Sequence, residues 1–198
     1  MFRITKPSKN LIADFIARCD DSNYTYPYIG ATQNGFRRSR KRKGTISYNV
    51  DHHSVVIGNG DKDWESAKKA IVSWKMFEMP WVQLCWPDTP IEEGQNVAIL
   101  IRHFEFYSLN AARIVYVIDK WDWFGFAYGT LSDHGESGEE RFTVRLDREN
   151  GDVIYDLYAF SRPNHFAAKL GYPLTRMLQK YFAVDSKAAM LRAIKTIG

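Results

Sequence analysis

Six strand-like segments follow one another between residues 81 and 160 with no helix between them. They are rich in β-branched and aromatic residues, and short turn-rich stretches such as PDTPIEEGQN and DRENGD separate them. Antiparallel neighbours can be joined by such turns, whereas parallel neighbours need a long crossover. The pattern therefore excludes a doubly wound parallel sheet and predicts one strongly curved antiparallel sheet. The segments span residues 81–86, 97–104, 113–119, 124–131, 141–146 and 153–160.

A further strand and two helices flank this series. Residues 44–58 have strand composition, and the helix expected over residues 61–77 places Trp64, Ala67 and Ile71 at helical spacing. Residues 164–198 close the chain with an apolar helical stripe. This order predicts an α+β helix-grip fold, with a curved antiparallel sheet of about seven strands wrapped around a long C-terminal helix. An elongated cavity between sheet and helix belongs to that architecture.

The first 43 residues differ from the rest of the chain in charge. They hold ten Lys/Arg against three Asp/Glu, whereas the remaining residues hold seventeen against twenty. A short amphipathic helix is expected over residues 9–19, with Ser8 as its N-cap. We therefore divide the chain into an N-terminal helical extension, residues 1–43, and a helix-grip domain, residues 44–198.

A basic block ends this extension. Like charges repel one another, so such a block is usually a solvated loop, and we favour that interpretation because no aromatic residues interleave with the charges. The alternative is an electrostatic handle for nucleic acid or an anionic membrane surface. The block comprises Arg37, Arg38, Arg40, Lys41, Arg42 and Lys43.

Cysteine usage and hydropathy bear on the compartment. Cys19 and Cys85 lie far apart and match no CxxC spacing, which favours reduced thiols in a cytosolic protein. The chain shows no signal-peptide core and no apolar run long enough to span a bilayer. We expect a cytoplasmic protein without structural metal or cofactor, and the sequence does not indicate an oligomeric state.

The stretch FGFAYGTLSDHGESGEERF, residues 124–142, holds the densest polar chemistry. Strand alternation places Glu140 on the same face as Phe142, so we expect an inward carboxylate that must be paired or have a shifted pKa. His134, Glu136 and Glu139 precede it in a Gly- and Ser-rich turn, which we interpret as solvated. Such a turn would hold metal ligands poorly, so we predict no metal site.

Arginines are the expected partners of Glu140. Arg113 opens one predicted strand, and Arg162 follows another in an SRP turn at the expected cavity mouth. A guanidinium there could pair with the carboxylate or hold a ligand head group. The aromatic residues of the sheet would either fill the interior or line a cavity. The predicted ligand-orienting residues are Arg113, Tyr128, Thr130, Glu140 and Arg162.

Four stretches together resemble an uncharacterised bacterial and plant family, the domain of unknown function number nineteen-ninety. They are WESAKKAIVSWKMFEMPWV, ARIVYVIDKW, FGFAYGTLSDHGESGEERF and AFSRPNHFAAKLGYPLTRMLQ. The resemblance implies a helix-grip fold similar to the START and birch-pollen-allergen superfamily, many of whose members bind lipids, hormones or polyketides. It implies no particular activity and no catalytic residues.

Three functional hypotheses follow. The first is a binding protein for a hydrophobic or aromatic small molecule that has an anionic or hydrogen-bonding end. The second is an enzyme that uses His134 with Glu136 or Glu140 as acid and base in the same cavity. The third is an adaptor that binds a membrane or nucleic acid through the basic block of residues 37–43.

Overall fold

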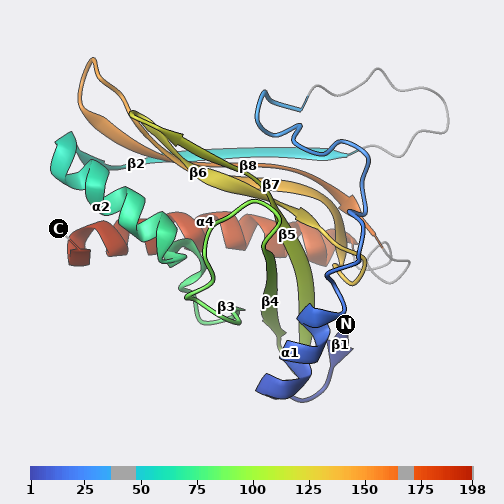
Figure 1. The fold of residues 1–198 in the computed structure, drawn as a ribbon. Coiled ribbons are helices and arrows are strands. Elements are labelled where there is room, and N and C mark those ends of the chain that lie inside the picture. Colours follow the sequence, from blue (N-terminus) through green and yellow to red (C-terminus); the bar gives the residue numbers. More distant parts are fainter. Residues whose placement is uncertain (37–47, 165–171, 198) are drawn as a thin grey trace.

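The computed structural model describes residues 1–36, 48–164 and 172–197. Its centre is an antiparallel sheet with the strand order β2-β8-β7-β6-β5-β4-β3, to which the short β1 adds beside β5 (Figure 1). The predicted curved antiparallel sheet is confirmed. The strands are β1 (Phe2–Arg3), β2 (Asn49–Asn59), β3 (Val82–Leu84), β4 (Asn96–His103), β5 (Phe106–Lys120), β6 (Trp123–Thr130), β7 (Glu136–Leu146) and β8 (Asp152–Pro163).

Three strands are longer than the sequence predicts. β5 begins at Phe106 rather than at residue 113, β7 begins at Glu136 rather than at residue 141, and β8 ends at Pro163 rather than at residue 160. The added part of β7 reads ESGEE, which has low strand propensity. It is held in the sheet because its residues pair with the end of β8, where Glu136 lies opposite Pro163.

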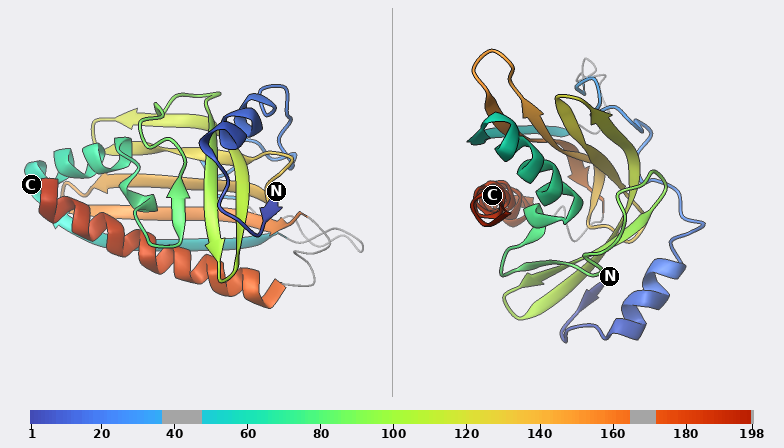
Figure 2. Two further views of the ribbon diagram at one scale, coloured as in Figure 1. Left: turned by 90° about the horizontal axis from the view of Figure 1, so that it is seen from below. Right: turned by 60° about the vertical axis from the view of Figure 1, so that its left-hand side comes forward.

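Three helical elements lie on the concave side of the sheet: α2 (Gly60–Val72), the 3-10 helix η1 (Lys75–Phe77) and α4 (Tyr172–Ile197). Asp63 accepts a hydrogen bond from the Asn59 amide (2.8 Å) at the start of α2. Figure 2 shows the sheet curling around α4, which is seen nearly end-on in its right-hand view. This arrangement confirms the predicted α+β helix-grip fold.

The main core fills much of the space between the sheet and these helices. Phe142 is fully buried at its centre, with ring centroids 5.4 Å from Phe77 and 5.5 Å from Phe126. Tyr155 is also fully buried, and its hydroxyl hydrogen bonds with Ser186 of α4 at 2.8 Å. Each such aromatic side chain contributes about 2–3 kcal/mol by its burial, so this core joins α4 to the sheet.

The N-terminal segment packs on the opposite, convex face. It contains α1 (Lys9–Ala17), and the Ser8 hydroxyl accepts a hydrogen bond from the Leu11 amide (3.3 Å), as an N-cap does. Phe15 of α1 packs with Leu109 of β5 in a second core. Residues 37–43 lie outside the described residues, so the adaptor hypothesis stays a prediction.

Within the described part of the chain, no helix is both long and apolar enough to cross a membrane.

Candidate ligand-binding pocket

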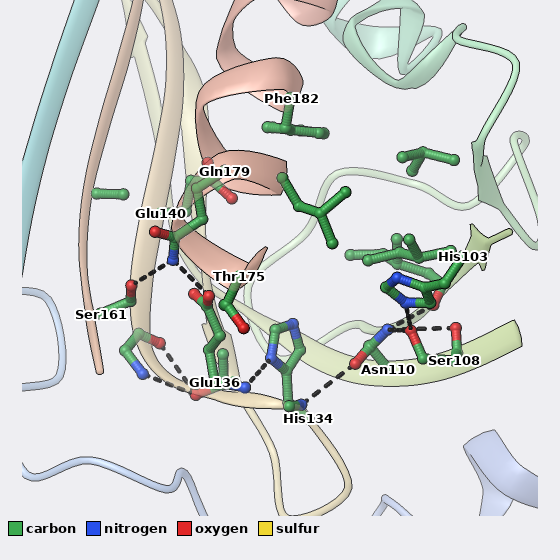
Figure 3. A pocket seen from close by; sticks show the side chains of 18 of the residues that line it. His103, Ser108, Asn110, His134, Glu136, Glu140, Ser161, Thr175, Gln179 and Phe182 are labelled. Atoms are coloured by element: carbon green, nitrogen blue, oxygen red, sulfur yellow. Dashed lines mark hydrogen bonds between the residues drawn. The ribbon is translucent and has the colours of Figure 1, made fainter. Parts of the chain in front are cut away.

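A pocket of about 970 Å³ lies between the concave face of the sheet and the first half of α4. Most of its wall is apolar, and polar side chains lie at both ends (Figure 3). The aromatic residues of the sheet therefore leave an open volume beside the core. Its apolar lining includes Phe77, Ile99, Ile101, Leu157, Leu178 and Phe182.

Strand alternation brings two carboxylates of β7 to this pocket. Glu136, Gly138 and Glu140 occupy alternate positions of the strand and all three line the pocket, and Phe142 continues the same face into the core. No side chain therefore stands between the two carboxylates on this face. The predicted inward orientation of Glu140 is confirmed.

Glu140 hydrogen bonds with a tyrosine across the strand pair. Tyr128 of β6 lies directly opposite it, and the Tyr128 hydroxyl donates to Oε2 of Glu140 at 2.7 Å. Burial raises the pKa of Glu140 to about 7, helped by the charges of Glu136 and Asp51, while the hydrogen bond from Tyr128 acts in the opposite direction. Burial and the nearby Glu140 also raise the pKa of Tyr128 well above its ordinary value, so its hydroxyl remains a donor.

Glu136 is held by the closing helix. The side-chain amide of Gln179 on α4 donates hydrogen bonds to the Glu136 carboxylate and to the Ser161 hydroxyl, the latter at 3.0 Å. Burial raises the pKa of Glu136 to about 7, although the hydrogen bonds from Ser161 and Gln179 and the charge of Arg176 lower it. The backbone amide of Glu136 donates to Nδ1 of His134 at 3.1 Å, so His134 lies beside it at the pocket.

An ion pair joins α4 to the edge strand β2 beside these groups. Arg176 donates to both carboxylate oxygens of Asp51, at 2.6 and 2.7 Å. Such a two-bond pair fixes the guanidinium plane as well as its charge. Asp51 and His53 of β2 both line the pocket, and burial lowers the pKa of His53. The pair therefore holds α4 against the sheet at the pocket wall.

A second polar group lies on the other side of the pocket (Figure 3). His103 at the end of β4 hydrogen bonds through Nε2 with the Ser108 hydroxyl at 2.7 Å, and its ring stacks on Phe106. Asn110 donates to the Ser108 hydroxyl at 3.1 Å and accepts from the Gly135 amide at 3.2 Å. Burial lowers the pKa of His103, which favours the neutral ring.

Arg113 does not reach this pocket. Its guanidinium lies on the convex face, where it donates to the carbonyls of Cys19 (2.6 Å), Asp20 (2.9 Å) and Ser22 (3.0 Å) after α1. The predicted pairing with Glu140 is therefore wrong. A β-bulge between Ile114 and Tyr116 reverses the alternation, so Arg113 does not share the inward face of the later residues of β5.

The other predicted residues are divided between the two faces. Arg162 does not pair with Glu140 either, because β8 extends past Arg162 and the side chain of its neighbour Ser161 takes the inward position. The Arg162 guanidinium lies 4.9 Å from the centroid of the Tyr48 ring. Thr130 lines the pocket, but its hydroxyl is engaged by the Thr25 hydroxyl (2.6 Å) and by the Gly138 backbone.

The interpretation of residues 134–139 as a solvated turn is wrong. His134 and Glu136 line the pocket, and Glu139 is buried on the convex face with 2% of its surface exposed. Glu139 accepts hydrogen bonds from the Tyr26 hydroxyl (2.8 Å), from the amides of Gly30 (2.7 Å) and Thr32 (2.9 Å), and from the Thr32 hydroxyl. The hydrogen-bond partners of Glu136 and Glu139 are distant in sequence, so the local sequence pattern did not indicate that these two side chains are buried.

Glu136 and Glu140 are suited to acid–base chemistry, since both carboxyl groups have pKa values of about 7 and line one pocket. Among the described residues, no three His, Cys, Asp or Glu side chains gather in a way that could hold a metal ion.

The sequence is similar along most of its length to one family model and to several known proteins. Residues 25–189 match the family model described as Domain of unknown function (DUF1990). A UPF0548 protein from Dictyostelium discoideum is 34% identical over 207 residues, covering 98% of this chain and 96% of the relative. A UPF0548 protein from Arabidopsis thaliana is 31% identical over 197 residues, covering 96% of this chain and 95% of the relative.

A solved structure shows a similar fold. The hypothetical protein jhp0584 from Helicobacter pylori superposes with a TM-score of 0.50 at 12% identity, over 87% of this chain and 94% of that chain. Because the family model spans most of the sequence and the two relatives match along nearly their whole lengths, this chain belongs to the family described as Domain of unknown function (DUF1990).

Proposed function

We propose that this protein binds a small, predominantly apolar molecule in the pocket between the sheet and α4, and that Tyr128 and Glu140 orient its hydrogen-bonding end. The observation that carries the proposal is the pocket itself. Its volume of about 970 Å³ lies at the upper end of the range of roughly 300–1,000 Å³ that is usual for small-molecule sites. A mostly apolar wall with a few fixed polar groups is also typical of such sites.

The lining favours an elongated ligand. Apolar side chains from β4, β8 and α4 lie between the Glu136–Glu140 end and the His103 end, so an apolar body spanning them would lose contact with water along its length. The Tyr128–Glu140 pair is already hydrogen bonded, so little ordering is required when a ligand's polar group meets it.

Binding can be tested with N-phenyl-1-naphthylamine, an uncharged aromatic probe whose fluorescence rises in apolar surroundings. Titration should give saturable binding at one site. Ala159→Phe, which adds a ring at the pocket wall, should weaken binding at least about tenfold. Val184→Phe is the matched control, because Val184 on α4 is 59% exposed.

Both variants should first be shown to unfold cooperatively near the wild-type temperature. The proposal would be overturned if wild-type protein bound no probe, or if Ala159→Phe bound as tightly as Val184→Phe. Should Ala159→Phe fail to fold, Ala159→Leu offers a smaller change at the same position.

A second candidate function is acid–base catalysis on a molecule held in the same pocket. The observation that favours it is the raised pKa of Glu136 and of Glu140, each about 7, which suits proton transfer near neutral pH. Wild-type protein and Glu140→Gln would each be incubated with a mixture of small metabolites, and the mixtures compared by mass spectrometry. Catalysis predicts compounds that only wild-type protein consumes, and identical mixtures would contradict it.

A further inference from the structure

At the Glu136–Glu140 end of the pocket, two carboxyl groups have no salt-bridge partner among the described residues, and they become negatively charged as the pH rises through about 7. Glu136 and Glu140 from β7 and Asp51 from β2 all face the pocket. Arg176 forms two hydrogen bonds with Asp51 and so balances that carboxylate. Within the described residues, neither Glu136 nor Glu140 forms a salt bridge, and their side-chain hydrogen-bond partners, Gln179, Ser161 and Tyr128, are neutral.

Among the other charged groups around the two glutamates, Arg176 acts on Glu136 and lowers its pKa, although its guanidinium forms a two-bond ion pair with Asp51. His53 on β2 has its pKa lowered by burial and by Lys187, so it adds little positive charge at neutral pH. Tyr128 on β6 stays protonated, and His134 accepts a hydrogen bond from the Glu136 backbone amide at Nδ1, a role open only to a ring nitrogen without a proton. On α4, Arg176 is engaged by Asp51, and Lys180 lines the pocket from an exposed position.

Resting on the proposed function, we infer that the polar end of the ligand is a cation, a protonated amine, which lies against Glu140 and Glu136. A carboxylate accepts hydrogen bonds but donates none, while an ammonium group has three donors and no acceptor. A buried carboxylate without a cation loses most of its solvation, and an ammonium partner compensates that loss. The neighbouring Gln179 and Ser161 supply further polar contacts at the same end.

Charge complementarity also selects against the opposite kind of ligand. A carboxylate or phosphate head group at this end would meet two glutamates on one strand face, and like charges in a partly dehydrated pocket repel strongly. The sequence analysis allowed a ligand with an anionic end, and such an end does not suit Glu136 and Glu140. The cation that was expected to receive it, Arg162, lies away from the pocket lining.

Three ligands of equal chain length test the inference: decan-1-amine, decan-1-ol and decanoate, each kept below the concentration at which it aggregates or separates from water, and measured by calorimetry at pH 8. The amine should bind at least about tenfold more tightly than decanoate, with the alcohol between them. Because a primary amine of this kind stays protonated to about pH 10 while Glu136 and Glu140 ionise near pH 7, amine affinity should rise from pH 5.5 to pH 8. Amine binding near pH 6.5 should also release protons to the buffer.

Two isosteric variants locate the effect. Glu140→Gln and Glu136→Gln should each reduce the preference for the amine over the alcohol, and the double variant should abolish it while alcohol binding remains. Glu149→Gln, at an exposed turn, is the control and should change nothing. If the alcohol binds but the amine has no advantage over decanoate, the inference fails and the proposed function stands. If none of the three binds to wild-type protein, both fail.

Discussion

The Tyr128 hydroxyl on β6 donates a 2.7 Å hydrogen bond to the Glu140 carboxylate on β7, at the wall of a 970 Å³ pocket. The two residues lie directly opposite each other in the antiparallel ladder, so the bond is fixed by the sheet rather than by a mobile loop. A polar pair on rigid strands and a mostly apolar wall together make a pocket that can orient a ligand.

Replacing Glu140 should change how stability depends on pH. Burial raises the pKa of Glu140 from its ordinary 4.5 to about 7, so the folded state binds more protons than the unfolded state between these values. The free energy of unfolding therefore falls as pH rises from about 4.5 to 7, by on the order of 3 kcal/mol for such a shift. Glu140→Gln should lose less stability between pH 5 and pH 8 in urea titrations. Glu149→Gln should show the same pH dependence as wild type. If the free energy of unfolding of Glu140→Gln changed with pH as much as that of wild type, the raised pKa of Glu140 would be refuted.

Replacing Glu139 should release the N-terminal segment from the sheet. Its carboxylate accepts hydrogen bonds from Tyr26, Gly30 and Thr32, and it is 2% exposed. Glu139→Ala leaves these donors without an acceptor, so we expect a loss of at least about 3 kcal/mol. Limited proteolysis should then cut within residues 22–36 much faster than in wild type. Cleavage at the wild-type rate would contradict this role.

Two glycines near the pocket should differ in their tolerance of a methyl group. A Cβ at Gly138 would lie 2.0 Å from the Phe160 carbonyl oxygen of β8, whereas at Gly135 the nearest atom would be 3.8 Å away. Gly138→Ala should therefore push β7 from β8 and cost about 1–3 kcal/mol. Gly135→Ala should be nearly neutral. Urea denaturation of both variants compares them, and equal stabilities would show that the strands adjust freely.

Arg113 should matter for stability and not for ligand binding. Its guanidinium donates to three carbonyls that follow α1, and Nε donates to the Asn96 side chain at 2.8 Å. Arg113→Ala should lower the free energy of unfolding by about 1–3 kcal/mol while the affinity for N-phenyl-1-naphthylamine stays the same. A folded variant with much weaker probe binding would restore Arg113 as a ligand-orienting residue.

Sequence reasoning was enough for the fold class and for three residues that line the pocket, Tyr128, Thr130 and Glu140. The run of strand-like segments without helices predicted an antiparallel sheet, and alternation from Phe142 placed Glu140 inward. Both inferences depend only on the two-residue repeat of a strand, which neighbouring residues set. The N-cap at Ser8 was predictable for the same reason, because capping is a local interaction.

The remaining parts of the pocket depend on contacts that a sequence does not display. The bulge after Ile114 changed the face of Arg113, and a bulge has no fixed residue signature. Glu136 is fixed by Gln179, and Glu139 is fixed by Thr32 on the far side of the sheet. Both glutamates lie in a Gly- and Ser-rich stretch with low strand propensity, and pairing with β8 overrides that preference.

The proposed binding function is tested most directly by a methyl NMR titration with decan-1-ol. The ligand should produce saturable shifts at methyl groups that line the pocket, with no shift at methyl groups of the convex-face core. Shifts confined to the convex face, or no saturable shift at any methyl group, would contradict the account. The pocket set is Ile99, Ile101, Leu157 and Leu178, and the convex-face set is Ile12, Leu100 and Leu109.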